Sequence, residues 1–136
     1  MVEVSKVPLL DLRRNPPDVD GALSEAFRRV MESGQYILGP EVEALEAEMS
    51  AYIGVRHALG VSSGTDALLL ALMALGVGPG DEVICPTYTF FATAGSVWRI
   101  GAKPVFVDSC LTCYNLLPQQ VAAKCTSRTK AIIPVH

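Results

Sequence analysis

Residues 58–72 read ALGVSSGTDALLLAL, a pattern typical of a short buried strand, a tight turn and a helix that begins at Thr65. Such a turn leaves backbone N–H groups free, and the N-terminus of the following helix adds partial positive charge at the same point. Ser62, Ser63 and Thr65 supply hydroxyl donors, and Gly64 lets the backbone approach a ligand closely. The stretch favours binding of an anion, most often a phosphate, although Ser-Gly-Thr turns are also ordinary helix caps.

The composition is that of a folded protein without a strongly charged surface. Half of the 136 residues are hydrophobic, 18% are charged, and the formal net charge is −3. No cluster of Lys and Arg suggests nucleic acid or an anionic membrane as a partner. The longest apolar run, residues 67–75, is too short to cross a bilayer, and the first ten residues lack the apolar core of a secretory signal. We therefore expect a soluble cytoplasmic protein.

The four cysteines are expected to be free thiols, because an intracellular protein keeps its thiols reduced. Cys110 and Cys113 have CxxC spacing, but a zinc ribbon needs a second such pair. A thioredoxin-like pair begins a helix, whereas this pair precedes Tyr114 in an expected loop. We predict no metal site in the chain.

The first part of the chain is expected to be an extended lead-in followed by two helices. Prolines argue against a helix over residues 1–17, so the domain is predicted to span residues 18–136. Apolar residues recur at three- and four-residue steps from Asp18 to Gly34, and this face is expected to pack on the domain. A second helix is expected from Pro40 to Gly54, with its glutamates along a solvated face rather than in a metal site.

Beyond the central stretch, short apolar strands alternate with helices. Strands are expected at residues 82–85, 104–107 and 130–135, and helices at 65–75, 87–100 and 118–123. The helix at 65–75 is apolar nearly all round, so we expect it to be buried on more than one side. This alternation predicts an α/β fold with a mostly parallel sheet and helices on both faces.

Ligands bind at the carboxyl ends of the strands in such sheets. Four segments follow predicted strand ends, and we expect them to converge there: the 62–66 turn, residues 86–90, Asp108 and His136. A P-loop is excluded because no Gly-Lys-Ser/Thr follows the turn. The GVGPGD segment at residues 76–81 opens a strand, the reverse of a dinucleotide-binding fingerprint. A phosphate cup beside an aromatic segment suits a flat, phosphorylated cofactor.

Six segments form a longer pattern: GPEVEALE (39–46), GVSSGTDAL (60–68), GPGDEVI (78–84), PTYTF (86–90), PVFVD (104–108) and AIIPVH (131–136). In register from Pro8 to His136, they resemble the DegT/StrS family of pyridoxal-phosphate (PLP) sugar aminotransferases. That family has the aspartate aminotransferase fold (fold type I), so the resemblance implies the N-terminal part of a PLP-transferase large domain. Residues 109–113, SCLTC, depart from the acidic, proline-containing turn usual in the family.

The resemblance implies roles for individual residues. It assigns cofactor binding to four positions and substrate binding to three: Ser63, Gly64, Thr65 and Phe90, and Tyr36, Tyr88 and His136. Gly64 and Thr65 correspond to the phosphate site, and Phe90 to the ring that stacks on the pyridine. For Tyr88 a packed core aromatic is an equal alternative, and for His136 a polar cap at a strand end. Asp66 is interpreted as a cap-region charge rather than as the acid that pairs with the ring nitrogen.

The resemblance also implies that the catalytic residue is not among these 136 residues. In the family, a downstream lysine forms the internal aldimine and a downstream acid keeps the ring nitrogen protonated. The lysines here do not occupy that position: Lys6, Lys103, Lys124 and Lys130. We therefore expect the chain to end in mid-fold and to be inactive alone.

The activity implied for the parent protein is transfer of an amino group from an amino acid, commonly glutamate, to a nucleotide-linked keto sugar, with a homodimer as the working form. Two alternatives stay open. One is a sugar dehydratase of the same family, in which His replaces the lysine. The other is a non-catalytic binding or regulatory protein that keeps only this part of the fold.

Overall fold

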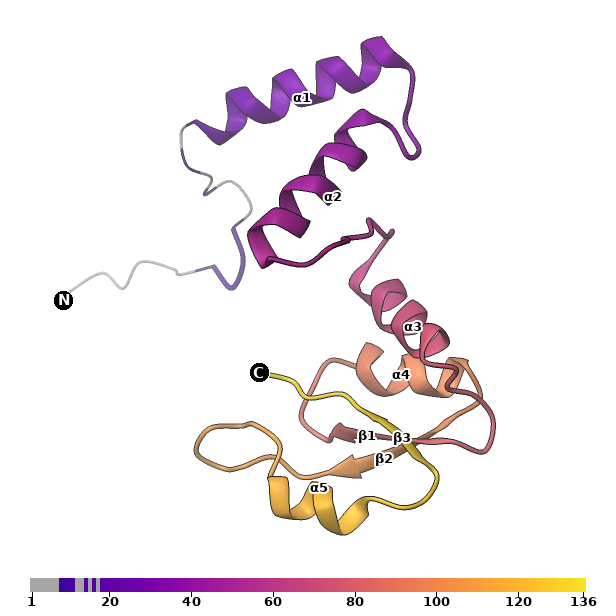
Figure 1. Cartoon of the computed structure of the whole chain (residues 1–136). Coiled ribbons are helices and arrows are strands. Elements are labelled where there is room, and N and C mark those ends of the chain that lie inside the picture. The colour runs from indigo at the N-terminus through magenta and orange to yellow at the C-terminus, as the bar shows by residue number, and fades with distance from the viewer. Residues whose placement is uncertain (1–7, 12–13, 15, 17) are drawn as a thin grey trace, which may run out of the picture. The chain divides into compact units, whose positions relative to one another are not determined.

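The computed structural model describes residues 8–11, 14, 16 and 18–136 (Figure 1). The chain divides into two compact units, Met1–Gly60 and Val61–His136. The extended lead-in predicted for residues 1–17 falls mostly outside the described residues. It therefore stays a prediction, as does the domain start at residue 18.

The first unit is built from two helices, α1 (Val19–Ser33) and α2 (Pro40–Ile53). Gly34 and Gly54 follow them in the left-handed conformation, with φ of 65° and 76°, which glycine adopts without strain. Pro40 stands at the first position of α2, where its missing N–H is not needed. These bounds confirm the two helices that the sequence predicted.

The apolar face of α1 is less buried than its pattern suggested. The side chains of Leu23, Phe27 and Met31 are each more than half exposed. The contact with α2 is partly electrostatic, because Arg29 Nε lies 2.7 Å from Glu41 Oε1. The packing expected of this face is not made within the first unit.

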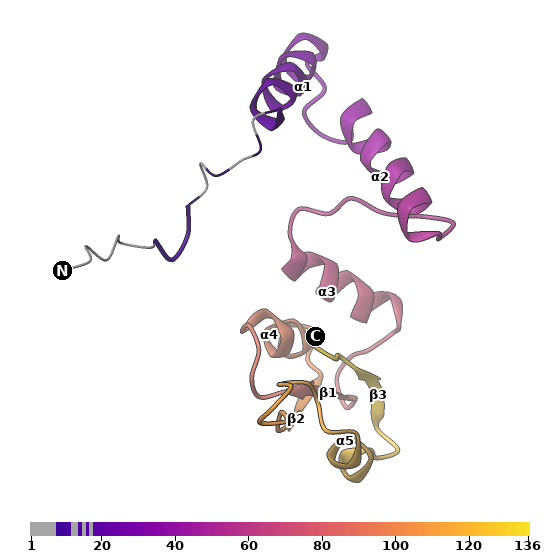
Figure 2. The same ribbon diagram turned by 90° about the vertical axis from the view of Figure 1, so that its left-hand side faces the viewer.

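The second unit alternates helices and strands in the order α3 (Gly64–Ala74), β1 (Glu82–Pro86), α4 (Ala92–Arg99), β2 (Lys103–Val107), α5 (Pro118–Lys124) and β3 (Thr129–Ile132). The strands form a parallel sheet in the order β2-β1-β3. Figures 1 and 2 show α3 and α4 on one side of this sheet and α5 on the other. The predicted α/β fold, with a parallel sheet and helices on both faces, is confirmed.

The hydrophobic core of the second unit surrounds β1, whose five residues are all buried. This is the pattern of a central parallel strand covered on both faces. Val83 packs with Leu72 of α3 and Val97 of α4. Ile84 is also fully buried, on the opposite face of the strand.

The strand predicted immediately before α3 is wrong. Residues 58–62, all of which are described, form no strand, and Leu59 is 77% exposed. The Gly60 N–H instead donates to the Glu46 carboxylate at 2.7 Å. Backbone groups of a strand need a partner, and the sheet formed by the described residues offers none to this segment.

The predicted burial of α3 on more than one side is also wrong. Leu72 is the buried residue of α3, whereas Leu70 and Met73 are exposed. In the described structure α3 packs against α4, which covers one face of it. The part of its apolar surface that carries Leu70 and Met73 therefore remains open.

Helix α4 begins later than predicted, at Ala92 rather than near residue 87. Thr87 is held outside the helix by two hydrogen bonds to the end of β2. Its N–H donates to the Val107 carbonyl at 3.0 Å, and its hydroxyl donates to Asp108 Oδ1 at 3.2 Å. These bonds leave residues 87–91 as a turn at the carboxyl edge of the sheet.

Strand β3 is shorter than predicted, because it ends at Ile132 instead of residue 135. The Ile133 N–H still donates to the Ile84 carbonyl at 2.8 Å. Pro134 has no N–H with which to continue the ladder, so pairing stops there.

A buried carboxylate joins the amino ends of the three strands. Glu82, the first residue of β1, is 3% exposed. Its carboxylate accepts hydrogen bonds from the Arg128 guanidinium at 2.8 Å, the Thr126 hydroxyl at 2.7 Å and the Lys103 ammonium at 3.4 Å. The Arg128 bond is the largest cause of a pKa lowered to about 2 for Glu82.

Neutralising Glu82 is expected to destabilise the fold. Because its folded pKa of about 2 lies below the ordinary value of 4.5, its contribution to stability is present at neutral pH and is lost as the pH falls from 4.5 toward 2. Glu82→Gln should lower the melting temperature by several degrees at neutral pH. The melting temperature of the variant should also fall less as the pH is lowered from 4.5 toward 2. Thermal unfolding followed by circular dichroism measures both effects. The exposed Glu48→Gln is the control, and equal melting temperatures for the two variants would contradict the prediction.

Candidate functional site

Helix α3 begins with two free backbone donors. Ser63 is the N-cap residue: its Oγ accepts the Asp66 N–H at 3.1 Å, and its carbonyl accepts the Ala67 N–H at 3.0 Å. Within the described part of the chain, the N–H groups of Gly64 and Thr65 make no hydrogen bond. These two groups and the Thr65 hydroxyl, together called the α3 cup, lie at the positive end of an eleven-residue helix, an arrangement that favours an anion.

The carboxylate of Asp66 is held by the serines before it. The hydroxyls of Ser62 and Ser63 donate to Asp66 Oδ2 at 2.5 Å and 3.0 Å. These bonds, the one from Ser62 first, lower the pKa of Asp66, and the charge of Arg99 lowers it further. Asp66 is thus a cap-region charge, as predicted. Because the Ser63 hydroxyl proton is already donated to Asp66, Ser63 shapes the α3 cup without offering that proton to a ligand.

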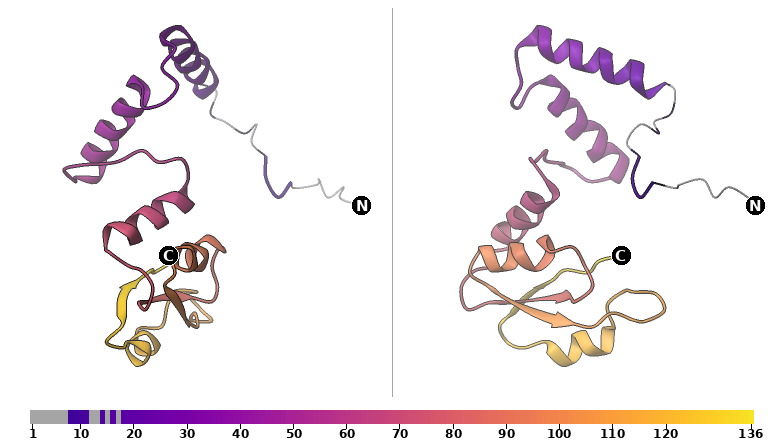
Figure 3. Two further views of the ribbon diagram at one scale, coloured as in Figure 1. Left: turned by 90° about the vertical axis from the view of Figure 1, so that its right-hand side faces the viewer. Right: turned by 180° about the vertical axis from the view of Figure 1, so that it is seen from behind.

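One cavity of about 560 Å³ brings the α3 cup together with other candidate residues. Its wall includes Gly64, Thr65, Phe90 and His136, with Leu68, Thr89, Ala92, Thr93, Ile133, Pro134 and Val135 between them. The contributing segments are the start of α3 and the chain that follows β1 and β3. Figure 3 shows the C-terminus beyond the end of β3. The predicted convergence at the carboxyl edge of the sheet is confirmed for these segments.

Phe90 lines this cavity and is 78% exposed as a residue, so its ring is accessible to a flat ligand. The turn that carries it is fixed by a 2.9 Å hydrogen bond between the hydroxyls of Thr89 and Thr93. These threonines were not among the candidate residues predicted from the sequence. Their four-residue spacing at the start of α4 is the signal that could have identified them.

Tyr88 lines an adjoining cavity of about 600 Å³ whose wall also includes Phe90 and His136. Tyr88 is 71% exposed, so the alternative of a packed core aromatic is wrong. Its ring centroid lies 5.9 Å from that of Tyr114, a residue that the sequence analysis did not select. Both tyrosines also line a further cavity, of about 630 Å³, whose wall includes Thr87 and Asp108.

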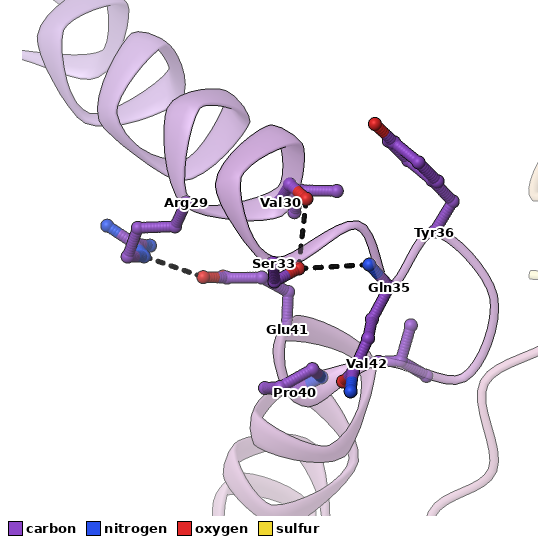
Figure 4. A pocket seen from close by; sticks show the side chains of 9 residues that line it. Arg29, Val30, Ser33, Gln35, Tyr36, Pro40, Glu41 and Val42 are labelled. Atoms are coloured by element: carbon purple, nitrogen blue, oxygen red, sulfur yellow. Dashed lines mark hydrogen bonds and ion pairs between the residues drawn. The ribbon is translucent and has the colours of Figure 1, made fainter.

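Tyr36 belongs to the first unit, where it lines a cavity of about 250 Å³ between the end of α1 and the start of α2 (Figure 4). The Ser33 hydroxyl fixes this loop, because it donates to the Val30 carbonyl at 2.9 Å and accepts the Gln35 N–H at 3.1 Å. The Tyr36 hydroxyl lies 3.6 Å from Met31 Sδ. The substrate-binding role of Tyr36 stays a prediction.

A family model for the DegT/DnrJ/EryC1/StrS aminotransferases matches residues 17–136. The chain belongs to this family. The DegT/StrS resemblance drawn from the six sequence segments is therefore confirmed.

Two curated relatives illustrate the range of the family. The chain is 50% identical over 130 residues to a pleiotropic regulatory protein of Geobacillus stearothermophilus, covering 96% of this chain and 35% of the relative. It is 47% identical over 129 residues to the UDP-2-acetamido-2-deoxy-3-oxo-D-glucuronate aminotransferase of Pseudomonas aeruginosa, covering 95% and 36%. The chain thus spans about a third of the length of the curated relatives it matches.

Solved structures of the family agree with the fold. The chain matches S. venezuelae DesV with a TM-score of 0.91 at 46% identity, over 96% of this chain and 35% of DesV. It matches Bacillus subtilis NtdA, solved with the bound cofactor PMP, with a TM-score of 0.91 at 37% identity, over 98% and 31%. This DegT/StrS chain therefore has the fold of the corresponding third of those proteins.

The remaining expectations concern the lysines, a metal site and a membrane-spanning helix. Of the lysines that the structure describes, neither Lys103, Lys124 nor Lys130 lines the cavities around Phe90. The described residues include no group of three or more His, Cys, Asp or Glu that could hold a metal ion. No helix among them has the length and apolar character needed to span a membrane.

Proposed function

We propose that the chain is the cofactor-binding part of a PLP-dependent aminotransferase. One observation carries the proposal: a single cavity has the α3 cup and the exposed ring of Phe90 in its wall. PLP is a flat ring with a phosphate, so free N–H donors and an aromatic face suit its two parts. The bound PMP in NtdA supports the same assignment.

We infer an amino acid, commonly glutamate, as the amino-group donor and a nucleotide-linked keto sugar as the acceptor. The P. aeruginosa relative supports this acceptor, because its name describes an aminotransferase of a UDP-linked oxo sugar. A homodimer and a cytoplasmic location belong to the same proposal. The homodimer rests on the resemblance to the family, and the location rests on the sequence expectation stated above.

The residues of this chain have distinct roles in the proposal. The N–H groups of Gly64 and Thr65 and the Thr65 hydroxyl hold the phosphate, and Phe90 packs against the face of the pyridine ring. Bound PLP supplies a carbonyl carbon that accepts an amino group and a ring that withdraws electrons. Tyr88 and His136 offer a hydroxyl and an imidazole to the sugar from the adjoining wall. The lysine that binds PLP is expected downstream of His136.

The test of this function uses a chain extended beyond His136 to the length of the relatives. It is incubated with PLP, glutamate labelled with heavy nitrogen, and UDP- or dTDP-linked keto sugars in turn. We expect an absorbance band from protein-bound PLP that disappears when glutamate is added. We also expect mass spectrometry to detect the labelled nitrogen in the sugar product. A PLP band with loss of water from the sugar and no label transfer would identify the dehydratase instead. Absence of any PLP band would overturn the proposal.

A regulatory protein is the second candidate, because the relative that is 50% identical is named a pleiotropic regulatory protein. This candidate predicts that the 136-residue chain is a stable monodisperse protein that melts cooperatively and does not retain PLP. Gel filtration, thermal unfolding and dialysis against PLP distinguish it from the cofactor-binding proposal.

A further inference from the structure

The two CxxC cysteines lie in a closed loop after β2. Ser109 and Leu116 form an antiparallel bridge at its base, and the Cys110 N–H donates to the Asn115 carbonyl at 2.9 Å. Inside the loop, the Tyr114 N–H donates to the Cys110 carbonyl at 2.9 Å, which closes a single helix-like turn. Residues three apart in such a turn lie on the same side, so Cys110 and Cys113 are neighbours. Cβ atoms at this spacing lie about 5–6 Å apart and a disulfide needs about 3.5–4.5 Å, so the turn tightens slightly when the bond forms.

The Cys110 sulfur is surrounded by hydrogen-bond donors. It lies 3.0 Å from the Thr112 hydroxyl. Bonds from Thr112, from the backbone N–H groups of Cys113 and Thr112, and from the Cys113 thiol lower the pKa of Cys110 to about 6. Cys85 is the opposite case, because burial raises the pKa of its thiol to about 11. The lowered pKa of Cys110 favours its thiolate, the nucleophilic form.

Cys110 is half-buried at the cavity wall and Cys113 is exposed. Cys110 can therefore attack a disulfide first, and Cys113 can then attack the Cys110 sulfur. We propose that Cys110 and Cys113 form a thiol–disulfide exchange site for low-molecular-weight disulfides such as glutathione disulfide.

The exchange proceeds in two balanced steps. The Cys110 thiolate attacks one sulfur of the glutathione disulfide, so a Cys110–glutathione bond forms and one glutathione thiolate leaves. The Cys113 thiol then loses its proton and attacks the Cys110 sulfur, which releases the second glutathione. The two protein thiols are oxidised to one disulfide, and one glutathione disulfide is reduced to two glutathione molecules.

The loop lines a cavity next to Tyr88, so a disulfide in the loop has a structural consequence there. Cys110 and Leu111 line a cavity of about 630 Å³ with Tyr88 and Asp108. Tyr114, in the same loop, contacts the ring of Tyr88. A disulfide that fixes residues 110–113 would therefore alter the surroundings of Tyr88. The inference concerns the thiols themselves and does not depend on the proposed aminotransferase activity.

The test treats the 136-residue chain with glutathione disulfide, blocks remaining thiols with an alkylating reagent after denaturation, and maps the peptides by mass spectrometry. We expect one disulfide between Cys110 and Cys113, with Cys85 and Cys125 alkylated. Cys113→Ser should stop the reaction at a glutathione adduct on Cys110. Cys125→Ser, which removes an exposed thiol elsewhere, should leave the disulfide unchanged. Adducts on Cys125 as rapid as those on Cys110, or no trapped adduct in Cys113→Ser, would overturn the proposal.

The pH dependence of Cys110 alkylation tests whether the neighbouring hydrogen bonds make this thiol reactive. The rate at which Cys110 is alkylated should rise with a midpoint near pH 6 and then level off. Thr112→Val removes a hydrogen bond to the sulfur, so its midpoint should move to higher pH, and Thr112→Ser should restore it. Identical profiles for Thr112→Val and the unchanged chain would contradict the assigned role of Thr112.

Discussion

Replacing Gly64 with proline is expected to weaken PLP binding by roughly 10- to 100-fold, because it removes one backbone donor of the α3 cup. A hydrogen bond to a charged group contributes about 1.5–3 kcal/mol, which corresponds to that loss of affinity. Proline suits the first position of a helix, where its N–H has no partner within the helix. The residue before it, Ser63, is already extended, with φ −162° and ψ 162°. The variant therefore deletes a donor while α3 stays folded.

Gly64→Ala is the matched control for this prediction. A Cβ at position 64 meets nothing within 4 Å, and alanine keeps the N–H. Equilibrium dialysis with PLP and with pyridoxal, which lacks the phosphate, measures the effect. We expect Gly64→Ala to retain the preference for PLP and Gly64→Pro to lose most of it. Equal PLP affinities for the two variants would show that the α3 cup does not hold the phosphate.

Ile84→Ala is expected to lower the free energy of unfolding by about 2–5 kcal/mol. Ile84 is fully buried in the central strand, between Val105 of β2 and Ile132 of β3. Truncation at this position leaves a cavity that two paired strands prevent from collapsing. Since native domains are stable by about 5–15 kcal/mol, the loss is a large fraction of the total.

Urea denaturation followed by circular dichroism measures this loss. The control is the same substitution at Ile37, whose side chain is 86% exposed, and a change within about 0.5 kcal/mol is expected there. A comparable loss of stability in both variants would contradict the assignment of Ile84 to the core.

The features that the sequence predicted correctly depend on local chemistry. Gly34 and Gly54 end their helices because glycine adopts the left-handed conformation without strain. The parallel sheet followed from the alternation of short apolar strands with helices. The α3 cup followed from a serine cap and a glycine at a helix start, and these are also properties of neighbouring residues.

The features that could not be predicted depend on partners far along the chain. The segment at 58–62 has strand-like residues, but a strand also requires a neighbour to pair with. The start of α4 depends on the bonds of Thr87 to Val107 and Asp108. The contact of Tyr114 with Tyr88 depends on how the loop after β2 folds, and residues 109–113 of that loop depart from the family pattern. Single-sequence patterns do not report such pairings.

The Glu82 carboxylate acts as a non-covalent cross-link. It ties the start of β1 to Lys103, 21 residues away, and to Arg128, 46 residues away. The first residues of β1 and β2 and the residue before β3 thereby share one carboxylate, which links the amino ends of the three strands. The α3 cup and Phe90 lie at the opposite, carboxyl edge of the sheet, where Thr87 is bonded to the end of β2. The carboxylate that links the three strands is therefore remote from the candidate site.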